Sequence, residues 1–285
     1  MNINDISKMI NVDADTITDI KQLTSIEDDS LYDVWKICIS NQNYILKKAK
    51  NDEIEIYNTF LKELKLGVPK LYNTYQYSNE SYLLIEYIEG NELFKCNKND
   101  LIKAVDSLIY IQKHYWNSNI TNKGYTYDKS LTSRINRGKY LNEAELEKHY
   151  NIFLDIYTKV PKTFCHDDLL PFNVIVNDYT GIIIDWEYAG ILPYLTSFVR
   201  LIAHGGENKE FFFIKESDKE YIINYYYDNL VKNKNISYSD YLYQLNYFLL
   251  YEYCEWIMLK NKYPEVDDDR YNLYFNKAKN LIQTL

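Results

Sequence analysis

The stretch FCHDDLLPFNVIVNDYTGIIIDWEYAG, residues 164–190, carries most of the information on fold and function in this chain. Two β-branched apolar triplets, Val174–Val176 and Ile182–Ile184, flank a short polar turn, and this pattern predicts a β-hairpin. Asn173 precedes the first triplet and Asp185 follows the second. Because the open ends of an antiparallel pair are neighbours, we expect these two side chains to lie at one edge of the hairpin.

A third oxygen-bearing side chain, Asp168, lies on the segment that leads into the same edge. Mg²⁺ binds few protein oxygens and completes its octahedron with water and phosphate, so two carboxylates and one amide suit a magnesium site. The alternative is that Asp168 and Asn173 only cap turns, which isolated Asp and Asn residues usually do. The complete set at this spacing favours the cation site.

The pattern H-x-D-x-x-x-x-N, formed by His166, Asp168 and Asn173, is followed by Ile184-Asp185-Trp186. Together these residues resemble the aminoglycoside phosphotransferase and choline kinase superfamily, whose protein-kinase-like signature is such a loop with a later metal-binding Asp. The resemblance implies that Asp168 accepts the proton of the substrate hydroxyl, and that Asn173 and Asp185 hold Mg²⁺. It implies that His166 orients the loop through hydrogen bonds.

Two other interpretations of the loop are less consistent with its spacing. Asp167 is the rival for the catalytic base, but Asp168 has the spacing of the motif to both His166 and Asn173. A nucleophilic pair of Cys165 and His166 is disfavoured, because neighbours in an extended segment point to opposite faces.

Residues 20 to 88 combine strand and helix signals, and the character of the chain changes after Gly90. We expect an α+β, protein-kinase-like fold with a small β-rich N-terminal lobe (residues 1–88) and a larger, mainly helical C-terminal lobe (residues 89–285). The first lobe is predicted to contain strands at 31–39, 43–48, 71–77 and 81–88 and a helix at 52–66. The second is predicted to contain helices at 101–115, 143–157, 219–232 and 241–260.

Lys47 ends the second predicted strand and resembles the phosphate-contacting lysine of the superfamily. The helix that follows supports this assignment, because Glu53 is in line with its apolar stripe of Ile56, Tyr57, Phe60, Leu61 and Leu64. A carboxylate that faces inward needs a partner, and Lys47 is the candidate. The alternative is that Glu53 only favours the positive end of the helix dipole.

The expected phosphate loop departs from the superfamily. Residues 25–30, SIEDDS, contain three acids and no glycine, and acids beside a triphosphate repel it unless they point away or bind metal. Ser30 offers a hydroxyl and a backbone N–H to the nucleotide. The resemblance further implies that backbone groups near Glu86 and Ile88 bind the purine edge of ATP or GTP. The pattern G-x-x-x-x-G-K-[ST] does not occur, which argues against a P-loop enzyme.

The acceptor is expected to contact the helices after Asp185. Acidic residues there suit a polycation such as an aminoglycoside, and nearby aromatic rings suit a quaternary ammonium through cation–π contacts. The candidate acids are Glu187, Glu252, Glu255 and the run 265–269, and the candidate rings are Tyr251, Tyr253 and Trp256. At helical spacing such aromatics are usually core and such acids usually solvated.

We therefore predict an enzyme that moves the γ-phosphoryl of ATP or GTP to a hydroxyl of a small cationic molecule, with an aminoglycoside-like acceptor favoured. A choline- or ethanolamine-type kinase is the first alternative, and a non-catalytic kinase-fold binding or spore-coat-like protein is the second. The family's usual acid a few residues after Asp185 is absent, since Leu195-Thr196-Ser197 stands there.

Composition is consistent with this interpretation. The chain has 285 residues, 46% of them apolar and 26% charged, and a net charge of −9. It has no long basic run, which argues against a nucleic acid or an anionic membrane as partner. The N-terminus is polar and acidic, and no apolar run approaches the roughly 18 residues of a membrane span. Four scattered cysteines favour reduced thiols in a cytoplasmic protein.

Overall fold

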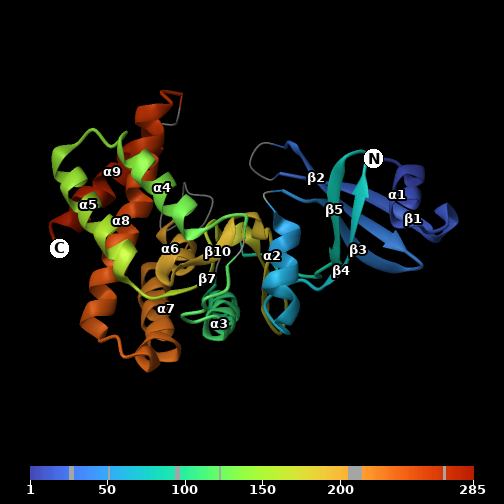
Figure 1. Ribbon diagram of the computed structural model, residues 1–285. Coiled ribbons are helices and arrows are strands. Elements are labelled where there is room, and N and C mark those ends of the chain that lie inside the picture. The colour runs from blue at the N-terminus through green and yellow to red at the C-terminus, as the bar shows by residue number, and fades with distance from the viewer. Residues whose placement is uncertain (26–28, 51, 94–96, 122, 205–213, 266–267) are drawn as a thin grey trace.

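The computed structural model describes residues 1–25, 29–50, 52–93, 97–121, 123–204, 214–265 and 268–285. Its N-terminal part is built on one antiparallel sheet with the strand order β1-β2-β3-β5-β4 (Figure 1). The strands are β1 (Ile17–Thr24), β2 (Leu31–Ile39), β3 (Gln42–Lys48), β4 (Leu71–Tyr77) and β5 (Glu80–Glu86). The predicted strands correspond to β2, β3, β4 and β5, whereas β1 was not predicted.

The two faces of this sheet pack against different partners. Helix α1 (Ile3–Ile10), which begins with a capping box between Asn2 and Asp5, covers the outer face with Ile6, Met9 and Ile10. The core on this side is completed by buried residues of the strands, namely Ile17, Trp35, Ile37, Leu46, Tyr82 and Leu84. The alternation of side chains along β5 places Leu83 and Ile85 on the opposite face, in the main core of the chain.

Helix α2 (Glu53–Thr59) lies between the sheet and the C-terminal part (Figure 1). The expectation of one α-helix reaching Leu66 is wrong, because α2 ends at Thr59, Phe60 has a φ of −118°, and a 3₁₀ helix (Leu61–Glu63) follows. This turn brings the fully buried Phe60 ring onto Phe164, with centroids 4.3 Å apart. The Tyr115 hydroxyl donates to the Phe60 carbonyl at 2.5 Å. Tertiary packing therefore ends the helix early.

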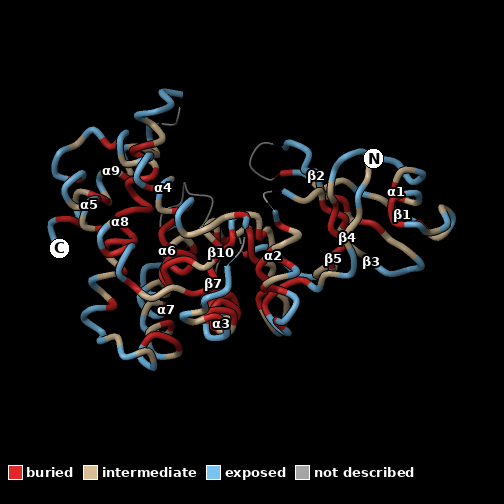
Figure 2. Tube along the Cα trace, viewed as in Figure 1, coloured by how far each residue is buried: buried red, intermediate tan, exposed pale blue. Residues whose placement is uncertain are grey.

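Helices dominate the rest of the chain, and their inward faces are buried (Figure 2). Within the described ranges they are α3 (Lys98–His114), α4 (Tyr127–Gly138), α5 (Ala144–Lys159), α6 (Leu195–Ala203), α7 (Glu216–Asn229), α8 (Tyr238–Lys262) and α9 (Asp268–Ile282). The four helices predicted for this part correspond to α3, α5, α7 and α8. None of the helices in the described ranges combines the length and the apolar character needed to cross a bilayer.

The predicted hairpin is present as β8 (Val174–Val176) and β9 (Gly181–Ile183), with Val174 opposite Ile183. β6 (Asn91–Glu92) adds to its edge, and a second small sheet pairs β7 (Lys162–His166) with β10 (Ala189–Pro193). Gly181 is required by close packing, because a Cβ there would lie 2.8 Å from the Cα of Ala104 in α3.

Candidate active site

His166 joins three segments around the loop that follows β7. Its backbone N–H donates to the Ser197 hydroxyl at 2.8 Å, and its Nδ1 accepts the N–H of Asp168 at 3.2 Å. Because Nδ1 accepts, Nε2 carries the proton and donates to the carbonyl of Ile184 at 2.9 Å. Burial lowers the pKa of His166, so the ring is neutral at pH 7. The hydrogen bonds expected of an orienting histidine are present.

The two neighbouring aspartates of the loop lie in different environments. The Asp167 side chain forms a two-pronged ion pair with Arg134, with Nη2–Oδ1 2.6 Å and Nη1–Oδ2 3.0 Å. It also accepts hydrogen bonds from Tyr125 and Ser130. Asp168 faces a cavity, with 37% of its side chain exposed. Of the two candidates for the base, Asp168 is therefore the more exposed, since the Asp167 side chain is only 7% exposed.

Asn173 and Asp185 occupy the open end of the β8–β9 hairpin, as the sequence predicts. The Ile184 N–H donates to the Asn173 carbonyl at 2.9 Å, so Asn173 lies opposite the residue that precedes Asp185. The Asn173 amide nitrogen donates to the Asp168 carbonyl at 2.8 Å, which turns its amide oxygen away from the loop. One carboxylate and one amide oxygen at a half-open edge are a donor set that fits Mg²⁺.

The backbone of Asp185 has φ 63° and ψ 61°, in the left-handed region. Such a conformation is uncommon for a residue with a side chain, although Asp tolerates it better than most. It follows β9 directly and redirects the chain into a short 3₁₀ helix (Trp186–Tyr188). This turn leaves the Asp185 side chain 40% exposed beside Lys47.

Lys47 contacts both acids that the motifs single out. Its Nζ lies 2.8 Å from Glu53 Oε1, which confirms the predicted ion pair, and 2.5 Å from Asp185 Oδ1. Burial alone would lower the pKa of Lys47, but the two carboxylates outweigh burial and raise it, so the ammonium stays charged. The group links β3 and α2, which are adjacent in sequence, to the hairpin, since Lys47 and Asp185 are 138 positions apart.

Glu53 is fully buried, and its second oxygen, Oε2, has no hydrogen-bond partner among the described residues. Burial raises the pKa of Glu53 despite the lysine, whereas burial of Asp185 is outweighed by Lys47 and its pKa is lowered. Asp185 is thus the better anion of the two, which suits a metal ligand. Glu187 lies near Glu53, since its negative charge contributes to raising the pKa of Glu53.

The other residues expected at the nucleotide are partly defined. The Ser30 carbonyl accepts the Ser25 N–H at 2.7 Å, whereas residues 26–28 of the expected phosphate loop lie outside the described residues. Glu86 ends β5 and its N–H donates to the Lys70 carbonyl at 2.9 Å, so this N–H is not available to a purine. Ile88 lies in the irregular link between β5 and β6.

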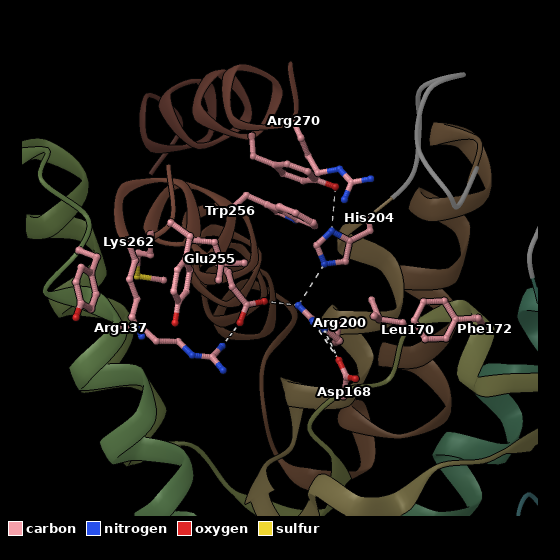
Figure 3. Close-up of a pocket in the computed structure, with 15 residues that line it drawn as sticks. Arg137, Asp168, Leu170, Phe172, Arg200, His204, Glu255, Trp256, Lys262 and Arg270 are labelled. Carbon is pink, nitrogen blue, oxygen red and sulfur yellow. Dashed lines mark hydrogen bonds and ion pairs between the residues drawn. The ribbon is translucent and has the colours of Figure 1, made fainter. Parts of the chain in front are cut away.

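A cavity of about 530 Å³ opens beside Asp168 (Figure 3). Its walls come from the loop after β7 and from α4, α6, α8 and α9. A second cavity of about 290 Å³ adjoins it and shares four residues with it, namely Arg137, Asp168, Arg200 and Glu255. The larger volume is within the usual range for small-molecule sites.

Arg200, on α6, was not identified from the sequence and is central to this cavity. Its guanidinium contacts Asp168 Oδ1 at 3.0 Å through Nη2 and also contacts Glu255 (Figure 3). Its Nη1 lies 2.8 Å from Glu252 Oε2. The available signal was that Arg200 is the one charged residue of the apolar helix LTSFVRLIA, and a buried charge requires partners. The identity of those partners depends on tertiary structure.

The acids expected to neutralise a cationic acceptor are therefore already paired. Glu252 and Glu255 are buried on α8, and Glu255 also contacts Arg137. Burial would raise the pKa of Glu255, but Arg200 and Arg137 outweigh it and lower the pKa to about 2. In the run 265–269, residues 266 and 267 lie outside the described residues, while Asp268 begins α9 and pairs with Lys260 at 2.6 Å.

Comparison with known proteins agrees with the motifs. Residues 121–228 match the model of a phosphotransferase enzyme family. The chain is similar to the protein LicA homolog of Mycoplasma capricolum subsp. capricolum, with 29% identity over 151 residues. That match spans 48% of this chain and 58% of the relative.

Solved structures resemble the whole chain at low identity. A thermostable mutant of aminoglycoside phosphotransferase APH(4)-Ia has a TM-score of 0.63 and 11% identity, with 99% of both chains covered. Choline kinase from Cryptosporidium parvum Iowa II has a TM-score of 0.63 and 15% identity, with 99% of this chain and 96% of that chain covered. These structures confirm the protein-kinase-like α+β fold. The family match over residues 121–228 agrees with the resemblance that the motif residues carry.

Proposed function

We propose that this chain transfers the γ-phosphoryl group of ATP or GTP to a hydroxyl group of a small molecule. The observation that carries the proposal is the position of Asp168. Its side chain lies at the wall of an acceptor-sized cavity. Its backbone carbonyl accepts the hydrogen bond from the Asn173 amide and so orients that side chain. Lys47 and Asp185 are paired at the open end of the adjoining hairpin.

Each of these groups has a distinct role in the proposed reaction. The Asp168 carboxylate accepts the proton of the acceptor hydroxyl as the new oxygen–phosphorus bond forms and the bond to the nucleoside diphosphate breaks. Lys47 holds the phosphates, and Glu53 keeps its ammonium in place. Asn173 and Asp185 are the residues that would hold Mg²⁺, which supplies neutralisation of phosphate charge when it is bound.

Arg134 and His166 support this chemistry without contacting the reacting atoms. Arg134 fixes Asp167, and His166 fixes the N–H of Asp168, so both sides of the base are anchored. Such anchoring matters because catalysis of phosphoryl transfer rests mostly on positioning and electrostatic stabilisation. The acceptor hydroxyl approaches Asp168 from the cavity.

The test is isothermal calorimetry with Mg²⁺–ATP and Mg²⁺–GTP, together with nucleotide turnover across a panel of hydroxyl acceptors. Asp168→Ala is expected to abolish turnover while the heat of nucleotide binding persists. Asp178→Ala, an exposed aspartate in the turn of the same hairpin, is the matched control and should leave turnover unchanged. A chain that gives no heat with either nucleotide would instead be a non-catalytic protein with this fold, and unchanged turnover in Asp168→Ala would remove Asp168 from the mechanism.

A further inference from the structure

Arg200 and the proposed base Asp168 meet in the wall of the cavity (Figure 3). Nη2 of Arg200 lies 3.0 Å from Asp168 Oδ1, and Nε lies 3.3 Å from the same oxygen. Within the described ranges, no side chain donates a hydrogen bond to the other oxygen, Oδ2. Arg200 therefore holds one oxygen of the carboxylate and leaves the second one able to accept a proton.

The opposite side of the same guanidinium is held by α8. Its Nη1 lies 2.8 Å from Glu252 Oε2 and also contacts Glu255. Both glutamates are buried, and the side chain of Arg200 is only 17% exposed. A buried charge that is paired on both sides cannot move without leaving a carboxylate unpaired, which is costly. The guanidinium is therefore a fixed point against which Asp168 is held.

The other hydrogen bonds of Asp168 fix its backbone and not its carboxylate. Its N–H donates to His166 Nδ1, and its carbonyl accepts from the Asn173 amide. These contacts do not determine the rotation of the side chain about its own bonds. Packing also restrains it little, because the side chain is 37% exposed. Among the described residues, Arg200 is thus the group that sets the orientation of the carboxylate.

We propose that Arg200 is a positioning residue, which fixes Asp168 Oδ1 so that Oδ2 receives the proton of the acceptor hydroxyl. Glu252 and Glu255 then act on the reaction through Arg200. The inference rests on the proposed function, in which the hydroxyl oxygen bonds to the γ-phosphorus as the bond to the nucleoside diphosphate breaks. Because such catalysis depends on geometry, a carboxylate that rotates freely should lower kcat without weakening nucleotide binding.

The test separates this role from the contribution of Arg200 to stability. Arg200→Gln is combined with Glu252→Gln, which removes the carboxylate that would otherwise be left without its partner. The double variant is compared with Glu252→Gln alone, so that the difference reports the loss of Arg200. Lys159→Gln is the control, because this exposed lysine on α5 pairs with Asp155 and is not among the cavity residues.

Three measurements are made on each variant. Release of ADP from Mg²⁺–ATP is followed with water as the acceptor and with choline, ethanolamine, kanamycin and glycerol. Calorimetry gives the affinity for Mg²⁺–AMP-PNP, and urea unfolding shows that the variant is folded. The double variant is expected to bind the nucleotide as tightly as Glu252→Gln. Its kcat is expected to be about a hundredfold lower, the order of the loss when a catalytic group is misplaced by about 1 Å.

A second pair of substitutions tests whether the guanidinium itself is what Asp168 needs. Arg200→Ala combined with Glu252→Gln leaves space beside Asp168 in the cavity wall. Guanidinium chloride at millimolar concentration is expected to raise the kcat of this variant about tenfold, the order of one charge-assisted contact. Sodium chloride at the same ionic strength should leave kcat unchanged, and neither salt should change the Lys159→Gln control.

Three outcomes would overturn the inference while leaving the phosphotransferase intact. These are a double variant with the kcat of Glu252→Gln, a fall in kcat that is matched by weaker nucleotide binding, or a fall in kcat that guanidinium does not reverse. Absence of ADP release from a wild-type chain that binds Mg²⁺–ATP, or absence of heat with both nucleotides, would overturn the phosphotransferase itself, and this inference with it.

Discussion

Replacing Arg200 by Gln should destabilise the protein strongly, because this one guanidinium compensates several carboxylates. The substitution keeps a polar side chain of moderate size and removes the charge. Asp168 is 37% exposed and can be solvated, and Glu255 keeps its contact to Arg137. Glu252 is affected most, since its side chain is 5% exposed and its remaining partner among the described residues is His204 at 3.3 Å.

The expected loss follows from leaving a buried carboxylate without its main partner. Breaking a buried ion pair by removing one member costs about 3–5 kcal/mol. Because His204 and the exposed edge of the cavity compensate part of the charge, we expect about 3 kcal/mol for Arg200→Gln. Adding Glu252→Gln removes the uncompensated charge and should recover about 2 kcal/mol, which makes the double variant more stable than Arg200→Gln.

The assay is urea unfolding at pH 7, followed by tryptophan fluorescence and by far-UV circular dichroism. Coincidence of the two probes checks that a single free energy of unfolding applies to both parts of the chain. Arg137→Gln is the matched control, because it removes the same type of contact to Glu255 from a side chain that is 48% exposed. Its expected cost is below about 1 kcal/mol.

The reasoning would be refuted by an Arg200→Gln variant that loses less than about 1 kcal/mol. It would also be refuted if Glu252→Gln failed to restore stability in the Arg200→Gln background. Either result would mean that water or a local rearrangement compensates the carboxylate in place of the guanidinium.

Three further predictions concern the site and its supports. Lys47→Met should abolish nucleotide binding measured by calorimetry and lower the free energy of unfolding in urea by about 3–5 kcal/mol, because Glu53 loses its partner. Adding Glu53→Met should restore stability but not nucleotide binding. Restored binding in the double variant would contradict the role of the lysine. Ser197→Ala removes the hydroxyl that accepts the His166 backbone N–H. It should lower the free energy of unfolding by about 1–3 kcal/mol and lower kcat with little change in the KM for nucleotide. An unchanged kcat would show that the loop is held by its other contacts. The pKa of Glu255 is lowered from its ordinary value of 4.5 to about 2 in the folded chain. At roughly 1.4 kcal/mol per pKa unit, this carboxylate contributes about 3 kcal/mol to the free energy of unfolding. The contribution is fully present above pH 4.5 and is lost as the pH falls toward 2. Unfolding free energies measured across that interval should fall less steeply in Glu255→Gln, and equal slopes would refute the assignment.

Local signals in the sequence were sufficient for much of the site. Apolar triplets around a turn located the β8–β9 hairpin, and the register of that hairpin placed Asn173 and Asp185 at one end. The position of Glu53 on the apolar stripe of α2 was sufficient to pair it with Lys47. In each case the partners are close in sequence or share one hairpin, so periodicity and turn chemistry determine their proximity.

The charges of the cavity were not predictable in the same way. Arg200 meets Asp168, Glu252 and Glu255 across 32 to 55 positions of the chain. The helical pattern of α8 indicated only that its acids lie near a buried face, and it did not indicate that an arginine from α6 reaches them. The pattern of α8 therefore did not indicate that Glu252 and Glu255 are paired within the folded chain.

Phe60 also bears on how the protein is made. Its ring is covered by Phe164 and Tyr115, and the Gly67 carbonyl that follows it accepts the N–H of Ile183 at 2.8 Å. During synthesis Phe60 therefore leaves the ribosome 55 residues before Tyr115 and about a hundred residues before Phe164. At roughly 5–20 residues per second, the nascent chain presents it for about 5–20 s, which is ample time for a chaperone to bind. Phe60 thus completes its packing only when β7 has emerged, whereas the core around α1 needs no residue beyond β5.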